Sequence, residues 1–495
     1  MIRFRSVHWL IALAVLLGLS GTLSAQELIH STYYGGSRGD GGYTFPIVVA
    51  EGGDVYVAIR TDSSDNLLAG SPVQDTYAGR GDLLIARFSA DLSELKASTY
   101  LGGTSEEGPW PSIDMVLDED SLVVAFPSNS LNLPTTESAY QPTRKGDYDI
   151  GIARLSLDLS TIIACTYLGG SGVEGAVSVA ITASGDVVVA GSTLSRNFPR
   201  TEEYPKSLSG GRRHGDVFVS ILDAGLTELK QSRLLPGGSD DIPEALCVHP
   251  NGDLVVAGWT QSHDLASYEG SPGYLGGTYD GFVVRLTADL SITQMAFVGG
   301  SDWDFVYAMA VTPDAIAVAG HTASSDFETT AGAIERSYQG ASGEGEGDDV
   351  FVTVLDNGLN VVASTYLGGE GWENATALVP VADGWALAGQ TNSSAFLSTL
   401  FEQEGSNPFA AEGFLAVLNK GLTEATVLQV GGDGIDCPAS LAVDGENRVW
   451  LLMGTTSTDL PIKENSWQPV NAGGTLRLET MVWSGDVWIG SYQLR

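Results

Sequence analysis

The sequence predicts an all-β protein: a seven-bladed β-propeller made of four-stranded antiparallel blades. The first observation is a Gly-Gly pair that recurs at intervals of 62 to 69 residues, starting at Gly35, Gly102, Gly169, Gly237, Gly299, Gly368 and Gly431. The second is that every interval repeats the same order of short apolar runs and polar turns, and none has the period of a helix. Four short strands in each of seven units fit blades placed around a central channel.

The first two strands of each unit are predicted to form a hairpin. In the third unit the apolar run Val177–Ile181 is followed by the turn Ser184-Gly185-Asp186 and by the run Val187–Ala190. Short apolar runs on either side of such a turn are typical of a hairpin. Because the runs are apolar on consecutive residues, we expect both faces of these strands to be covered by neighbouring sheets.

Two further strands complete each unit. The hairpin ends in the pattern G-x-T-x-S, a long loop follows, and the third strand begins with an acid. These acids are Asp82, Asp149, Asp216, Asp280, Asp349 and Glu412, whereas the seventh unit has Thr475 at this place. A fourth strand, such as Leu95–Leu101, leads into the next Gly-Gly pair. Leu28–Tyr34 and Val487–Leu494 both resemble fourth strands, so we expect the two chain ends side by side in the last blade.

Residues 1–25 are predicted to be a signal peptide, and residues 26–495 a single propeller domain. Arg3 and Arg5 precede the apolar stretch Trp9–Leu19, and small residues lead to a cleavage site after Ala25. The apolar stretch is shorter than the ~20 residues that cross a bilayer. We therefore expect a secreted or periplasmic protein without a membrane span.

Composition restricts the partners that this protein can have. The chain has a formal net charge of −37, which disfavours nucleic acid and anionic lipid. Cys165, Cys247 and Cys437 show no metal-binding spacing and are interpreted as small buried residues. No nucleophile elbow, zinc-protease or Walker motif is present, and His263 and His321 are interpreted as exposed loop residues. We expect a monomer.

The repeat resembles that of the bacterial β-propeller repeat (SBBP) proteins. The shared pattern is a tyrosine-rich strand, Gly-Gly, an acid, a hairpin, T-x-S and Phe-Pro, as in Thr193-Leu194-Ser195 followed by Phe198-Pro199. The resemblance covers the whole of residues 26–495. It implies a propeller and very little about activity.

A carboxylate recurs shortly after each Gly-Gly pair. These seven residues, called the ring acids below, are Asp40, Glu107, Glu174, Asp241, Asp304, Glu373 and Asp436. The links between blades open beside the channel, so the acids should form a ring at its mouth. They could bind calcium or another cation. The alternative, typical of a motif present in every blade, is that each accepts backbone N–H bonds in its own turn.

Aromatic residues near the ring acids break the symmetry. Trp303 and Trp372 directly precede Asp304 and Glu373, and Trp110 follows Glu107. Indole beside carboxylate is typical of a sugar-binding surface, with the carboxylates as acceptors for hydroxyl groups. That interpretation requires exposed indoles. The alternative is that the tryptophans pack between blades.

Two functions remain open. The favoured one is an exported binding or scaffold protein that presents its long-loop face to a polysaccharide or an extracytoplasmic protein. The alternative is a carbohydrate-active enzyme, a glycoside hydrolase or lyase, that uses carboxylates at the channel mouth. Binding is favoured because no acid pair stands out from the other copies, whereas catalysis needs individually tuned groups. No residue is assigned as catalytic.

Overall fold

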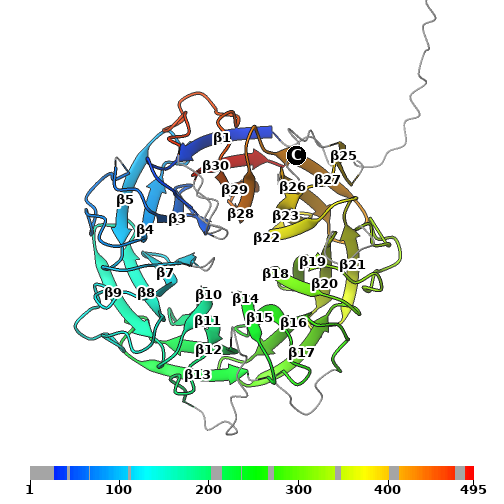
Figure 1. The fold of residues 1–495 in the computed structure, drawn as a ribbon, viewed down its shortest axis with the longest axis horizontal. Coiled ribbons are helices and arrows are strands. Elements are labelled where there is room, and N and C mark those ends of the chain that lie inside the picture. The colour runs from blue at the N-terminus through cyan, green and yellow to red at the C-terminus, as the bar shows by residue number, and fades with distance from the viewer. Residues whose placement is uncertain are drawn as a thin grey trace, which may run out of the picture.

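The computed structural model describes residues 27–41, 45–65, 67–109, 113–201, 215–235, 237–265, 273–340, 347–397, 399–400, 412–473 and 485–494. In this part the chain forms seven four-stranded antiparallel sheets around an axis, which confirms the seven-bladed propeller (Figure 1). The described residues include no helix with the length and hydropathy of a membrane span. The predicted signal peptide, Trp110 and Thr475 lie outside the described residues.

In each blade the first strand lies nearest the channel and the fourth lies outermost. In blades one to six the strands follow chain order. Blades one to three contain β2 (Ile47–Val49), β3 (Val55–Thr61), β4 (Asp82–Phe88) and β5 (Leu95–Leu101); β6 (Asp114–Leu117), β7 (Ser121–Ser128), β8 (Asp149–Ser156) and β9 (Ile162–Leu168); β10 (Glu174–Ile181), β11 (Val187–Thr193), β12 (Asp216–Leu222) and β13 (Leu229–Leu235). Blades four and five contain β14 (Asp241–Val248), β15 (Leu254–Thr260), β16 (Asp280–Leu286) and β17 (Ile292–Val298); β18 (Asp304–Val311), β19 (Ala315–Thr322), β20 (Asp349–Asp356) and β21 (Val361–Leu367).

Blades six and seven complete the ring. Blade six contains β22 (Glu373–Val381), β23 (Gly384–Thr391), β26 (Glu412–Asn419) and β27 (Ala425–Val430), and carries the small hairpin β24 (Ala395–Phe396) and β25 (Thr399–Leu400). Blade seven contains β28 (Asp436–Val443), β29 (Arg448–Thr455), β30 (Asp486–Gln493) and β1 (Glu27–Tyr34).

Blade seven joins the two ends of the described chain. The N-terminal strand β1 lies beside β30 (Figure 1). The two strands pair antiparallel, with Tyr34 opposite Val487. The expectation that the ends meet here is confirmed, but β30 is the third strand and only β1 is the fourth. The expectation that Thr475 heads the third strand is wrong: β30 begins at Asp486. An acid therefore heads the third strand of every blade.

The core lies between the blades. In β11, Val187 and Val189 pack with residues of blade two, whereas Val188 and Ala190 pack with residues of blade four. Successive side chains of a strand point to opposite faces. Because both faces of this strand are covered, the sequence shows a continuous apolar run instead of alternation.

A buried leucine marks the turn between the third and fourth strands. Six blades have a leucine with φ between 53° and 60° at this place: Leu92, Leu159, Leu226, Leu290, Leu359 and Leu422. The carbonyl oxygen of Leu226 in blade three accepts the N–H of Tyr140 in blade two at 2.8 Å, and Leu422 accepts Ile334 in the same way at 2.9 Å. In these blades the turn therefore links one blade to its neighbour.

Candidate ligand site at the mouth of the channel

Five ring acids are the first residues of inner strands, whereas Asp40 and Glu107 form isolated β-bridges to Thr61 and Ser128 ahead of β2 and β6. All seven are bonded within their blades. All seven are at most 2% exposed. In blade seven Asp436 accepts the N–H of Gly432 at 2.8 Å and the hydroxyls of Thr455 and Ser457 at 2.6 and 2.7 Å. In blade three Glu174 accepts the N–H of Gly170 and the hydroxyl of Thr193. The T-x-S motif therefore supplies hydroxyl donors to the ring acid.

Burial raises the pKa of these carboxyl groups. The pKa is about 6 for Asp40, Glu107 and Asp304 and about 7 for Glu174. Among the described residues, no three His, Cys, Asp or Glu side chains converge as a metal site would require. Calcium on the ring acids Asp40, Glu107, Glu174, Asp241, Asp304, Glu373 and Asp436 remains a prediction from sequence.

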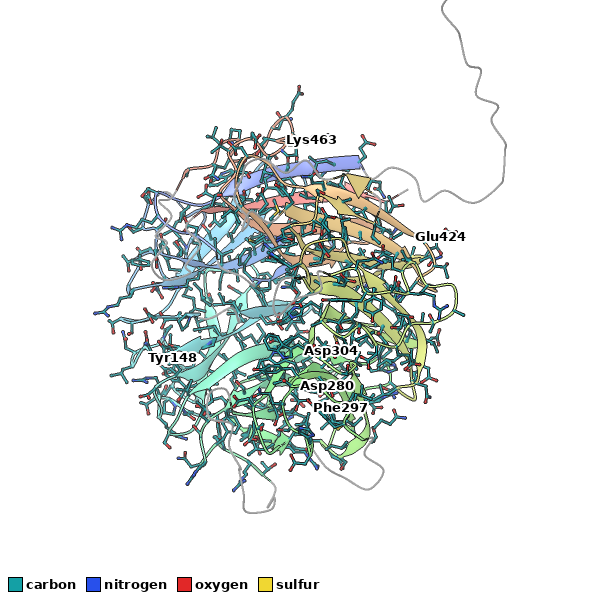
Figure 2. All side chains as sticks on the ribbon, turned by 45° about the vertical axis from the view of Figure 1, so that its right-hand side comes forward. Tyr148, Asp280, Phe297, Asp304, Glu424 and Lys463 are labelled. Carbon is teal, nitrogen blue, oxygen red and sulfur yellow. The ribbon has the colours of Figure 1, made fainter. Side chains whose placement is uncertain are left out.

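A second carboxylate approaches the ring acid at the junction between blades. Between blades four and five, Asp280 heads the third strand and Asp304 begins the next inner strand (Figure 2). Both carboxylates lie within 2.9 Å of the position that a Cβ would take on Gly299. A side chain on that residue would collide with the pair, so glycine is required. Burial, assisted by the charge of Asp304, raises the pKa of Asp280 to about 7.

The inner strands carry a bulge that turns one side chain towards the channel. The pairing register shifts after the ring acid in β10, β14, β18, β22 and β28. The channel-lining residues three places after the ring acid are Val177, Glu244, Tyr307, Thr376 and Ala439. The residue at this position differs among these five blades, as expected where a bulge aims a side chain at a site.

The channel forms a cavity of about 820 Å³. Its deeper wall is apolar, with residues such as Leu246, Met309 and Leu441. Asp114 is bonded across the wall to the hydroxyl of Ser178 and the N–H of Val179, both at 2.8 Å, and burial raises its pKa. The described lining contains no lysine or arginine.

Blade four contributes a carboxyl group to the channel mouth. Glu244 accepts the indole N–H of Trp259 at 3.0 Å. Burial raises the pKa of Glu244 to about 7. Tyr307 of blade five faces the same cavity, and burial followed by the charge of Glu244 raises the pKa of its phenol. The pKa values of Glu244 and Tyr307 are therefore set by surroundings that occur once, unlike those of the repeated ring acids.

Blade five contributes a histidine. His321 lies within β19, partly buried, so its interpretation as an exposed loop residue is wrong. Its ring centroid is 4.9 Å from that of Phe305 and 5.4 Å from that of Tyr307, and its Nε2 is 3.7 Å from a carboxylate oxygen of Asp348. Burial lowers the pKa of His321, and the charge of Asp348 and the polar side chain of Asn374 oppose this only in part.

An aromatic wall connects this cluster to the surface. Trp303 is 47% exposed and meets Tyr279 edge-to-face at 5.8 Å. Tyr279 in turn contacts Trp259 at 5.5 Å and Phe305 at 4.8 Å. Trp372 occupies the same place one blade further and is partly buried. Neither indole is enclosed in the core.

The carboxylates beside the indoles are not exposed, contrary to the expectation that they accept bonds from sugar hydroxyls. Asp304 and Glu373 are at most 1% exposed and are bonded within their own blades. They cannot accept bonds from a ligand at the surface. Asp348, which lies 3.7 Å from His321, and the exposed Asp302 are the acceptors near the surface at this place.

Comparison with known proteins gives no family and only distant structural similarity. No family model matches the chain, and no curated protein matches it. Similar solved structures include a protein of unknown function from Dyadobacter fermentans (11% identity, TM-score 0.41, covering 95% of this chain and 99% of that one) and an ulvan lyase of polysaccharide lyase family PL25 (10%, 0.44, 88% and 94%). Another is the β-propeller domain of the Trilobed protease from Pyrococcus furiosus (11%, 0.38, 85% and 92%). Membership of the SBBP family remains a prediction.

The side chains that differ from blade to blade at the channel mouth were not recognised from the sequence as site residues. Glu244 and Tyr307 become visible when the repeats are aligned on the ring acid and read three places on. Trp259 and His321 share another position, directly before the threonine of T-x-S. Both positions vary between blades, and variation within a strict repeat was the available signal.

Proposed function

We propose that this protein binds a carbohydrate at the channel mouth over blades four to six. The observation that carries the proposal is the exposed indole of Trp303, backed by Tyr279 and continuous with the aromatic wall of the channel. The apolar face of a sugar ring stacks on such a surface, while polar groups fix its hydroxyls. Asp348, His321, Asn374 and Glu244 supply these groups.

The charge of the site favours a neutral or amino sugar. The described channel lining has Asp114 and Glu244 but no cationic side chain, and the whole chain carries a net charge of −37. A uronate or sulfated polymer would be repelled by this field. An uncharged or positively charged saccharide would not.

Binding is tested by calorimetry with Trp303→Ala, using neutral, amino-sugar and uronate oligosaccharides. An exposed tryptophan that anchors a ligand contributes about 2 kcal/mol, so Kd should rise about 30-fold. The matched control is Val362→Ala, because Val362 is a 55% exposed apolar residue on the outer strand β21. Unchanged affinity of Trp303→Ala for every saccharide bound by the wild type would refute the proposal.

A second candidate function is a carbohydrate-active enzyme at the same site. The observation that favours it is Glu244, a half-buried carboxyl group with a pKa of about 7 that lines the cavity together with Tyr307, whose ring packs against that of His321. General acid–base catalysis needs a group whose pKa is close to the working pH.

We also propose export by the segment 1–25, with a mature protein that starts at Gln26.

A further inference from the structure

A glutamine bridges the blade junction in blades one, two and seven. In blade two the side-chain oxygen of Gln141 accepts the N–H of Gly169 at 3.2 Å, and its amide nitrogen donates to Asp149 at 2.6 Å. Gln74 and Gln468 make the same pair of bonds to the junctions that follow. The bridge needs one acceptor and one donor, which an amide provides.

Blade five has a glutamate at this place. The backbone N–H of Glu335 donates to Thr365 at 3.0 Å, as that of Gln141 donates to Thr166 at 2.9 Å. The Glu335 carboxyl accepts the N–H of Gly368 at 3.0 Å. In blades one, two and seven the amide nitrogen of the glutamine donates to the acid at the head of the third strand. In blade five the second carboxylate oxygen of Glu335 takes the place of this nitrogen.

That acid is Asp349, the first residue of β20, and it is fully buried. One of its oxygens accepts the N–H of Gln339 at 2.6 Å, as Asp149 accepts that of Lys145 at 2.8 Å. In Asp82, Asp149 and Asp486 this same oxygen also accepts the glutamine amide, whereas no side-chain donor to Asp349 is described. The other oxygen of Asp349 has no partner among the described residues, as in Asp82 and Asp486. Two ionised carboxylates cannot donate to each other, so the amide bridge of the other blades has no equivalent here unless a proton is present.

The surroundings offer no positive charge to separate the two carboxylates. The ionisable groups that face the pair are Asp348 beside Asp349, Tyr338 in the same loop, Tyr366 on β21 and Glu373 on β22. No described ion pair involves Glu335, Asp349 or Glu373, and the neighbouring Arg336 is exposed. Burial, with the charge of Glu373, raises the pKa of Glu335 to about 7, and burial, with the charges of Glu373 and Glu335, does the same for Asp349.

We propose that Glu335 is protonated and donates its carboxyl hydrogen to Asp349, so that a shared proton closes the junction between blades five and six. Raising the pH removes this proton and loosens the junction. Asp348 and Trp372 directly precede Asp349 and Glu373 in the chain, so the loosened junction is the one that carries two residues of the channel mouth. The proposal does not depend on the identity of the ligand.

The test compares thermal unfolding of the wild type, Glu335→Gln and the reverse variant Gln141→Glu at pH 5 and pH 8. At pH 5 the three proteins should melt at similar temperatures, because each junction has its donor. At pH 8 Glu335→Gln should melt above the wild type, and Gln141→Glu below it. A Glu335→Gln variant that melts below the wild type at pH 8, or that shifts Tm equally at both pH values, would overturn the proposal.

Two further measurements distinguish a shared proton from a bound cation between Glu335 and Asp349. The infrared difference spectrum of the wild type minus Glu335→Gln at pH 6 should show the C=O band of one additional protonated carboxyl group, because the other buried acids contribute equally to both proteins. Absence of this band from the difference spectrum would also overturn the proposal. Calcium should have the same effect on the Tm of both proteins at pH 8. A calcium-dependent rise in Tm confined to the wild type would show that a metal ion bridges the pair.

Discussion

At the scale of residues, Glu244 differs from the ring acids. A ring acid such as Asp436 uses its oxygens on an amide and two hydroxyls of its own blade. Glu244 accepts one bond, from Trp259, and lines the cavity. The repeated carboxylate therefore stabilises a blade, whereas the carboxyl group that occurs once is available for chemistry.

Glu244→Gln tests whether this carboxyl group is catalytic. Glutamine keeps an acceptor for Trp259 but cannot exchange a proton. If the site cleaves a glycosidic bond, the variant should lose about 10²-fold or more in rate and keep its affinity for the saccharide. Reducing ends would reveal a hydrolase, and ultraviolet absorbance of a new double bond a lyase. Cleavage by the variant at the wild-type rate would exclude Glu244 as the acid or base.

At the scale of elements, the turn between the third and fourth strands combines strain with burial. Leu159 has a φ of 57°, a left-handed conformation that disfavours side chains, yet its side chain is fully buried. Its carbonyl oxygen accepts the N–H of Val73 from the neighbouring blade at 3.1 Å. Burial of a leucine contributes about 2 kcal/mol, which offsets a backbone cost of about 1 kcal/mol.

Substitutions at Leu159 should separate these two terms. Leu159→Ala loses the burial and keeps the strain, so stability should fall by about 3 kcal/mol. Leu159→Gly loses the same burial but relieves the strain, and it should be at least as stable as Leu159→Ala. Leu155, buried in β8 without a positive φ, is the control: there glycine should be worse than alanine. Chemical denaturation of the four variants measures this, and the same order at both positions would contradict it.

At the scale of the whole molecule, the propeller buries acids at its blade junctions all round the ring. Burial raises the pKa of eight of them to between about 6 and about 7: Asp40, Glu107, Glu174, Asp216, Asp280, Asp304, Asp349 and Asp486. In the unfolded chain such groups titrate near pH 4. The folded state therefore binds protons that the unfolded state has already lost.

Stability should consequently fall as the pH rises from about 4 through about 7 and change little above that, since linkage favours the state with more bound protons. Thermal unfolding at fixed ionic strength should give a higher Tm at pH 5 than at pH 8. Added salt screens repulsion between surface acids but leaves the buried groups largely unaffected, so most of the difference should persist in salt. A Tm that rises between pH 5 and pH 8 would contradict this account.

Local patterns were sufficient to predict much of the fold and part of the site. The Gly-Gly spacing, the hairpin turns and the acids that head the third strands are short-range features, and seven copies make them unambiguous. The position of Trp303 at the surface of the mouth follows from the same repeat. The third strand of blade seven could not be placed in this way, because its fourth strand comes from the opposite end of the chain.

The number of blades, the order of strands and the position of each ring acid depend on repeated local chemistry and can therefore be predicted from the sequence. What the acids bind and which residues line the channel follow from contacts between blades, which the sequence does not specify locally. Glu244 and Tyr307 belong to different strands and line one cavity because bulges and blade packing bring them together, and the ring of His321 packs against that of Tyr307. The role of Glu335 likewise depends on the carboxylate that it faces, that of Asp349. Such contacts join residues distant in the chain, and burial then sets their protonation.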